Sequence, residues 1–303
     1  MNKIIILLIP CMLFADILMI SDSGTDPRSS GMRNSDLAIH RQNGGFYSNP
    51  AVMAEQESIY FSSFYHNYFS DISLTSVKYS HPDLILKDVS TGFSLTAINY
   101  GKFSDIESGD SYNPYEMLIT ISQGYRIKKI MTGLNLKYAY SSISEYNADA
   151  LLIDIGLMYK FFNERLVIAG GLFNVGFQIS EYYDTTENVG ISMKTAAAYS
   201  LDKLPLSISL QYERFEDEKS RLAVGMELQA KDNITVRGGY DLNGIDKQTG
   251  TNNNTEKFSG LSFGTTLFLN DFDFDISYML NGELEDEFGF SVGMNISNFI
   301  MNK

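Results

Sequence analysis

The stretch that decides the fold is Leu151-Leu152-Ile153-Asp154-Ile155-Gly156-Leu157-Met158-Tyr159-Lys160-Phe161. Every odd position is apolar, whereas the even positions include Asp154, Gly156 and Lys160. Strict alternation predicts a β-strand with one apolar face and one mixed face. The run is also longer than the roughly 5–6 residues of an ordinary strand. It reaches the roughly 9–11 residues that a tilted strand needs to cross a membrane.

The same alternation recurs on both sides of this stretch, most clearly in 206–213, 271–280 and 288–297. It begins near Ser58, where the composition becomes richer in aromatic and apolar residues. We predict about fourteen strands, near 58–66, 70–80, 90–100, 115–125, 130–141, 150–161, 165–175, 190–200, 205–213, 220–229, 233–242, 258–269, 271–280 and 287–297.

The connections between these strands alternate in length along most of the chain. The short ones are 126–129, 162–164, 201–204, 230–232 and Asn270. The long, polar ones are 101–114, 142–149, 176–189, 214–219, 243–257 and 281–286. Outer-membrane barrels have short periplasmic turns and longer external loops. The first two connections depart from this rule, because 66–70 is short and 81–89 is long. An even strand count predicts that both termini are periplasmic.

Alternation alone fits two architectures. In a soluble sandwich the apolar faces of two sheets pack together, whereas in a membrane barrel they face lipid. Strand length, an export signal and a small or polar second face favour the barrel. That second face includes Gly133, Asn135, Ser207, Gln211, Gly225, Gln229, Ser262, Gly264, Gly293 and Asn295. We therefore predict an all-β fold, a transmembrane antiparallel β-barrel of about 14 strands over 58–297, followed by a tail at 298–303.

Tyrosines lie near the ends of several predicted strands. They are suited to the membrane interface and equally to ordinary packing. They are Tyr140, Tyr159, Tyr199, Tyr212, Tyr240 and Tyr278.

The N-terminus has the three parts of a secretory signal. Lys3 precedes an apolar run over 4–14, and the small residue Ala15 follows. The run is too short to cross a bilayer as a helix. We predict a signal peptide at 1–15. The alternative is a lipoprotein with Cys11 as the lipid-bearing residue, which Pro10 disfavours. Cleavage after Ala15 removes the only cysteine, so the mature chain would form no disulfide.

Residues 16–57 differ from the rest of the chain. The stretch from about Ser21 to Tyr47 is polar and rich in Gly and Ser, and Gly44-Gly45 and Asn49-Pro50 are turn signals. We predict an irregular N-terminal segment that forms a plug or lies in the periplasm.

The composition excludes some classes of function. The formal net charge is −14, from 37 acidic and 23 basic side chains. Nucleic acid is an unsuitable partner, because phosphate binding needs a basic surface. There is no His-Glu-x-x-His motif and no cysteine pair for zinc. We predict neither enzymatic activity nor a cofactor.

Two chemical roles, a catalytic base and a metal site, have weaker support in the sequence. His66 is the one candidate base for a phospholipase of the barrel type, and a solvent-facing loop residue is the simpler interpretation. Asp271, Asp273 and Asp275 share one strand face, but they lack the loop geometry of a calcium site. A polar row facing the lumen is the simpler interpretation there.

The sequence resembles the PorV/PorQ family, a branch of the wider group of FadL-like (fatty-acid-transporter-like) outer-membrane barrels. The resemblance rests on short motifs whose order runs through the mature chain. They are Asp26-Pro27-Arg28-Ser29-Ser30-Gly31-Met32, Asn49-Pro50-Ala51, His66-Asn67-Tyr68-Phe69-Ser70-Asp71-Ile72, Asn99-Tyr100-Gly101-Lys102-Phe103, Gly133-Leu134-Asn135-Leu136-Lys137-Tyr138 and Gly239-Tyr240-Asp241. The chain departs from the family at Arg33, where Gly is usual, and at its C-terminus, which lacks a terminal aromatic residue.

The resemblance implies a 14-stranded barrel in the cell outer membrane, with an N-terminal segment folded into or under the lumen. It implies a plug motif formed by Arg28, Gly31, Met32, Asn49, Pro50 and Ala51. Members of the resembled family are accessory proteins of the type IX secretion system, and others in the group carry hydrophobic molecules.

Three functions follow as hypotheses. The first is an accessory barrel for type IX secretion or surface display, with outer-membrane lipid, secretion-system components and exported proteins as partners. The alternative is a FadL-like channel for hydrophobic small molecules, and the third is a structural anchor. A channel needs a continuous apolar pocket. The predicted lumen-facing positions are mostly small or polar, which favours the accessory role.

Overall fold

The computed structural model describes residues 26–39, 44–68, 70–104, 109–180, 190–216, 219–242, 258–282 and 285–298. The predicted signal peptide at 1–15 lies outside the described residues. So do positions 16–25 of the predicted N-terminal segment and 299–303 of the predicted tail.

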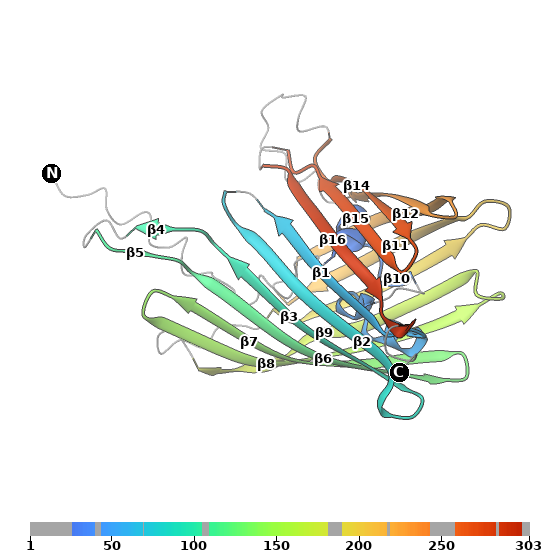
Figure 1. The fold of residues 1–303 in the computed structure, drawn as a ribbon, viewed down its shortest axis with the longest axis horizontal. Helices are drawn as coiled ribbons and strands as arrows, with labels where there is room; N and C mark the ends of the chain where they lie inside the picture. The colour runs from blue at the N-terminus through green and yellow to red at the C-terminus, as the bar shows by residue number, and fades with distance from the viewer. Residues whose placement is uncertain are drawn as a thin grey trace.

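Fourteen strands form one closed antiparallel barrel (Figure 1). Each strand pairs with its neighbours along the chain, and β1 pairs with β16 to close the sheet, from Tyr60–Asn295 to Asn67–Phe288. The barrel strands are β1 (Tyr60–Asn67), β2 (Ser73–Leu86), β3 (Val89–Asn99), β6 (Tyr115–Ile127), β7 (Ile130–Ile143), β8 (Tyr146–Phe161), β9 (Leu166–Ser180), β10 (Ser192–Ser200), β11 (Leu206–Phe215), β12 (Ser220–Lys231), β13 (Ile234–Asp241), β14 (Leu261–Leu269), β15 (Phe272–Met279) and β16 (Glu287–Asn295).

The predicted all-β barrel of fourteen strands is confirmed, and three local predictions change. Residues 81–86 continue β2 past a register shift, so the connection predicted at 81–89 shrinks to a turn at 87–88. The connection predicted at 142–149 is likewise a turn at 144–145. In the predicted loop 101–114, β4 (Phe103–Ser104) pairs with β5 (Ser111–Tyr112), and both project beyond the barrel (Figure 1).

These changes remove one exception to the alternation of short and long connections. With β2 ending at Leu86, turns at 87–88, 128–129, 162–165, 201–205, 232–233 and 270–271 all lie at one end of the barrel. This is the periplasmic end in barrels of this type. The opposite end has longer intervals such as 100–114 and 242–260, although 68–72, 144–145 and 216–219 are short.

The outer wall of the barrel is apolar. In β8, the outward-facing Ile153, Ile155 and Leu157 are 40%, 47% and 51% exposed, while the inward-facing Leu152 and Asp154 are fully buried. Exposed apolar side chains recur on the outward positions of every barrel strand and are sparsest on β3, β12 and β13. Such a surface is unfavourable in water and suits lipid.

Three short helices lie inside the barrel, where Figure 1 shows them in blue between the walls. They are α2 (Pro27–Gly31), η1 (Gly45–Tyr47) and η2 (Pro50–Glu55). Helix α2 packs against β13–β16, and η2 packs against β3 and β6–β8. We call residues 26–39 and 44–59 the luminal segment. Among the described residues, no helix is long and apolar enough to cross a membrane.

We expect Ile155→Arg to destabilise the barrel by about 2–4 kcal/mol, because a cation near the bilayer midplane loses its hydration. Ile127→Arg is the matched control, since Ile127 ends β6 at the periplasmic rim and should cost about 0–1 kcal/mol. Urea unfolding in lipid vesicles measures both. Equal, small effects would contradict a lipid-facing outer wall.

Candidate functional site: the occupied lumen

The Asn49-Pro50-Ala51 motif begins helix η2. The Asn49 side-chain oxygen accepts a hydrogen bond from the Ala51 N–H at 3.0 Å, and Pro50 occupies the first turn, where no N–H is needed. The Asn49 amide nitrogen also donates to the backbone oxygen of Leu37 at 2.9 Å. Asn49 is completely buried. The motif therefore starts a helix and ties it to the chain that precedes it.

A row of glycines in the wall receives η2. Gly124, Gly133 and Gly156 are direct partners across β6, β7 and β8. A methyl group on Gly133 would lie 2.1 Å from the carbonyl carbon of Pro50. One on Gly156 would lie 2.2 Å from the Asn49 side-chain oxygen. These distances are far inside van der Waals contact, so only glycine lets the helix backbone lie on the sheet at these positions.

A second set of glycines receives the end of α2. Gly225 and Gly239 are partners across β12 and β13, and a methyl group on Gly239 would lie 2.2 Å from the carbonyl carbon of Met32. A methyl group on Gly31 would in turn lie 2.9 Å from the Cα of Gly264. Gly31 and Met32 therefore seat on the opposite wall from η2, and the luminal segment bridges the barrel.

Arg28 fastens α2 to this wall with an ion pair. Its Nε and Nη2 donate to the two carboxylate oxygens of Glu227 at 3.0 and 2.8 Å. Glu227 also accepts from Arg237 Nε at 2.6 Å, and Arg237 Nη1 lies 3.4 Å from Asp275 Oδ1. A two-point arginine–carboxylate pair fixes orientation as well as charge. The positive charge of Arg28 is thus matched within the wall.

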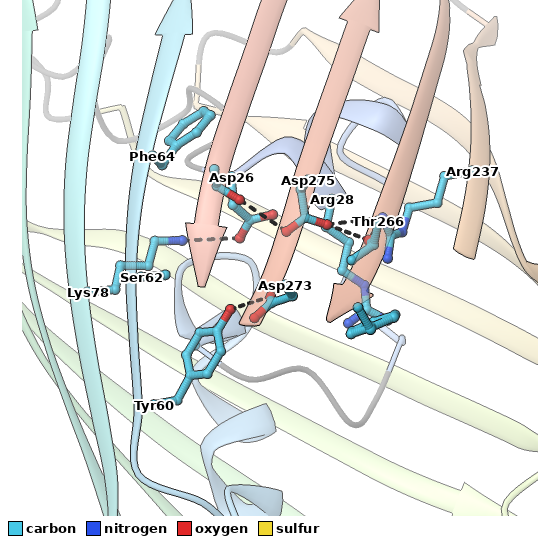
Figure 2. Close-up of a pocket in the computed structure, with 13 residues that line it drawn as sticks. Asp26, Arg28, Tyr60, Ser62, Phe64, Lys78, Arg237, Thr266, Asp273 and Asp275 are labelled. Atoms are coloured by element: carbon cyan, nitrogen blue, oxygen red, sulfur yellow. Dashed lines mark hydrogen bonds and ion pairs between the residues drawn. The ribbon is translucent and has the colours of Figure 1, made fainter. Parts of the chain in front are cut away.

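Asp26 attaches the start of α2 to β2. Its carboxylate accepts from Lys78 Nζ of β2 at 3.1 Å and from the Ser29 N–H at 2.9 Å, which caps α2 (Figure 2). Burial alone would raise the pKa of Asp26. The Lys78 ammonium and the Ser29 N–H outweigh burial, and the pKa falls below its ordinary value. Asp26 is therefore held as a carboxylate.

A polar cavity of about 110 Å³ lies between these ion pairs, lined by groups from α2 and from β1, β2 and β13–β16 (Figure 2). Tyr60 donates to Asp273 at 2.6 Å. Asp275 accepts from Thr266, and from Ser291 at 3.0 Å. These two carboxylates therefore have protein donors, and Asp271 accepts from Asn298 at 3.2 Å. No group of three or more possible metal ligands occurs among the described residues.

His66 is not the solvent-facing loop residue that we predicted. It belongs to β1, points inward and is 1% exposed, because β1 extends to Asn67. Its Nε2 lies 2.9 Å from Glu287 Oε2, and its ring stacks on Tyr68 at 4.4 Å. No serine within the described ranges hydrogen-bonds to His66, so the phospholipase reading gains no geometric support.

The lumen is more apolar than we predicted. In its extracellular half, inward-facing residues of six strands pack with Phe46, Tyr47 and Met53 of the luminal segment. The wall residues of this outer apolar cluster are Phe64, Leu74, Ile98, Leu118, Ala139, Ala148, Ala150 and Leu152. The polar prediction relied mostly on residues of β11, β12, β14 and β16, whereas these apolar residues lie on β1–β3 and β6–β8.

A second, inner apolar cluster occupies the periplasmic half. Its wall residues are Met131, Met158, Val167, Ala169, Phe173, Ala196 and Ala198, and the luminal segment adds Met32, Leu37, Ala38, Ile39, Ala51 and Val52. Beside it, a cavity of about 360 Å³ is lined partly by Ile39, Val167, Leu204 and Pro205. The inner cluster and most wall residues of the outer cluster lie on the β6–β10 side of the lumen, and Phe64, Leu74 and Ile98 extend the outer cluster onto β1–β3.

A buried polar layer separates the two clusters. Lys137 Nζ lies 2.6 Å from Asp154 Oδ2, and both side chains are at most 2% exposed. Asn135 donates to Asp154 at 2.9 Å, and Lys137 donates to Asn174 at 3.0 Å. Asn174 has a positive φ of 57° at a register shift in the β8–β9 pairing. This layer therefore interrupts the apolar lining of the lumen between the two clusters.

The structure brings all six residues of the predicted plug motif into the lumen, but at two separate seats. Arg28, Gly31 and Met32 contact the β12–β15 side, whereas Asn49, Pro50 and Ala51 contact β6–β8. Sequence reasoning missed the wall partners Lys78, Glu227 and Arg237. A charged residue at an inward-facing strand position is the signal that could have found them. In a membrane barrel a charge on the face away from lipid points into the lumen.

No protein-family model and no curated relative matches the sequence. The fold does match solved structures. A Pseudomonas aeruginosa FadL homologue has a TM-score of 0.58 at 12% identity, covering 89% of this chain and 98% of that chain. The P. putida toluene transporter TodX has a TM-score of 0.61 at 11% identity, covering 90% and 98%. The monoaromatic hydrocarbon channel CymD has a TM-score of 0.63 at 12% identity, covering 89% and 96%.

These likenesses establish the fold. The chain is a transmembrane barrel of the FadL-like architecture, a fold of the cell outer membrane, as predicted. Nothing in them distinguishes the PorV/PorQ branch.

We expect Gly133→Ala to destabilise the seating of the luminal segment by about 1–3 kcal/mol, since the added methyl group overlaps the Pro50 backbone. Faster proteolysis of the N-terminal segment and a lower urea midpoint would report this. Gly238→Ala is the control, because its methyl group would meet only ordinary contacts at 3.7 and 3.8 Å. Equal effects of the two variants would contradict the role given to the glycine row.

Proposed function

We propose that this protein is an outer-membrane channel for hydrophobic small molecules. The observation that carries the proposal is the pair of apolar clusters that line the lumen, one in each half of the barrel. A water-filled pore has no need of them, because its lining is polar. Two structural neighbours, TodX and CymD, are described as a toluene transporter and a monoaromatic hydrocarbon channel, which supports this reading over a secretion role.

The proposed path has three parts. A hydrophobic molecule first enters the outer apolar cluster, between the extracellular strand ends and Phe46 and Met53. It then passes the closure formed by the luminal segment and the Lys137–Asp154 layer. It leaves through the inner apolar cluster and the adjoining 360 Å³ cavity at the periplasmic end.

Passage therefore requires the luminal segment to move. The segment is held by backbone contact with glycine rows and by ion pairs, and neither kind of contact links it covalently to the wall. This makes the closure reversible, with the ion pairs setting the position to which the segment returns.

A disulfide lock tests this mechanism. Ser35 Oγ of the luminal segment lies 3.4 Å from Ser209 Oγ of β11, so S35C/S209C should crosslink when oxidised. We expect the oxidised variant reconstituted in liposomes to lose most toluene uptake and the reductant to restore it. The only cysteine of the sequence, Cys11, lies in the predicted signal peptide. Cleavage of that peptide leaves the two introduced cysteines as the only thiols.

The matched control is S104C/S111C, whose residues are direct partners in the β4–β5 hairpin that projects beyond the barrel. This pair crosslinks the hairpin away from the proposed path and should leave uptake unchanged under the same oxidation. Full uptake through the oxidised S35C/S209C barrel would overturn the proposed path.

The type IX secretion role, with secretion-system components or exported proteins as partners, stays a prediction that rests on the PorV/PorQ resemblance. Deleting the gene separates the two functions. We expect the deletion to lower uptake of hydrophobic compounds and to leave the surface-exposed proteins unchanged. Loss of surface proteins with normal uptake would favour the secretion role instead.

A further inference from the structure

A cavity at the periplasmic end has a charge unlike the rest of the protein. It has a volume of about 390 Å³ and lies between the β6–β7 and β8–β9 turns. Four cationic side chains line it, Arg126, Lys128, Lys129 and Lys160, in a chain whose formal net charge is −14. We call this cavity the basic rim site.

Two of the four cations already have carboxylate partners. Arg126 Nη2 lies 2.6 Å from Glu55 Oε1, at the end of η2, and Lys160 contacts the same oxygen. Lys160 also lies 3.2 Å from Glu164 Oε2. Arg126 and Lys160 are therefore committed to holding the luminal segment and the neighbouring turn.

The other two cations are uncompensated. Lys128 and Lys129 form the β6–β7 turn and are exposed, and neither has a hydrogen bond or an ion pair within the part of the chain that the structure describes. Two carboxylates face four cations at this site, so an anion would be attracted to the two lysines.

The apolar residues around the turn indicate where this anion comes from. Ile127 and Ile130 flank the two lysines and are 52% and 44% exposed on the lipid-facing wall. Phe162, in the adjacent β8–β9 turn, is 72% exposed. The apolar belt thus reaches the rim, which places both lysines at the level of the lipid headgroups. Lysines at the end of an apolar belt extend towards this interface.

We propose that the basic rim site binds an anionic phospholipid of the periplasmic leaflet. Lys128 and Lys129 contact the lipid phosphate, and the acyl chains lie against Ile127, Ile130 and Phe162. A soluble phosphate would use only the lysines, whereas the exposed Phe162 and the two isoleucines offer contact area that only a lipid fills. The site is independent of the proposed channel, because neither lysine lies on the path through the lumen.

Lipid titration of the folded protein in detergent tests the assignment. The probes are short-chain phosphatidylglycerol and phosphatidylcholine, with bound lipid counted by native mass spectrometry. We expect preference for phosphatidylglycerol, weakened about 5-fold by either K128A or K129A and about 25-fold by K128A/K129A, the effect expected of lysines at an anionic lipid surface. The control K203A/K231A removes two exposed lysines from other turns at the same end and should leave the preference unchanged.

A fluorescence experiment separates a bound lipid from a bound soluble anion. The chain contains no tryptophan, so F162W introduces a single reporter. Brominated phosphatidylglycerol should quench F162W more strongly than brominated phosphatidylcholine, and K128A/K129A should abolish the difference. F177W, on the lipid-facing side of β9 at its other end and 63% exposed as phenylalanine, should be quenched equally by both lipids.

Three results would overturn the proposal. The first is equal binding of the two lipids. The second is a phosphatidylglycerol preference that survives in K128A/K129A. The third is inorganic phosphate displacing the lipid at equal concentration while F162W is quenched equally by both brominated lipids. Folded barrels migrate differently on unheated gels, and loss of this mobility shift identifies a variant that does not fold. If K128A/K129A does not fold, the difference in quenching of F162W, which keeps both lysines, tests the proposal.

Discussion

The pairing of β1 with β16 closes the sheet, and the rest of the structure depends on this closure. Lipid offers no hydrogen bonds, so every backbone N–H and C=O of the wall must find a partner within the sheet. Eight consecutive residue pairs between β1 and β16 provide those partners where an open sheet would leave two bare edges. Closure also divides the side chains into two populations, since the alternation of a strand sends neighbours to lipid and to the lumen.

A barrel of fourteen strands encloses more space than its own inward side chains fill, and the luminal segment occupies it. The segment is held in two different ways. The segment lies directly on the glycine rows of β6–β8 and β12–β13, where any Cβ would overlap with it. Charged groups at Asp26 and Arg28 meet wall partners at Lys78 and Glu227. The first contact sets how deep the segment lies, and the second sets its orientation.

The lumen has two unlike sides as a result. The ion pairs that hold Asp26 and Arg28 lie on the β12–β13 and β2 side, whereas the inner cluster and most wall residues of the outer cluster lie on the β6–β10 side. A segment attached to the polar side and packed on the apolar side covers any route along the latter. Glu55 extends this arrangement to the periplasmic rim, where Arg126 and Lys160 hold it beside the two uncompensated lysines. The function of the lumen and the lipid contact of the rim therefore use neighbouring but different cations.

Several properties followed from the sequence by itself, because they depend on local alternation. The period of two in 151–161 and its repeats predicts strand number, strand length and the lipid-facing side, and each of these needs only neighbouring residues. The Asn49-Pro50 start of a helix is equally local. Other properties were decided only by the tertiary structure. Gly124, Gly133 and Gly156 form a row only once the register of three strands is set, and Arg28 meets Glu227 across 199 positions of chain. The buried place of His66 and the apolar outer cluster likewise depend on which strand ends come together around the lumen. A pattern within one strand contains no information about the residue that register places opposite it.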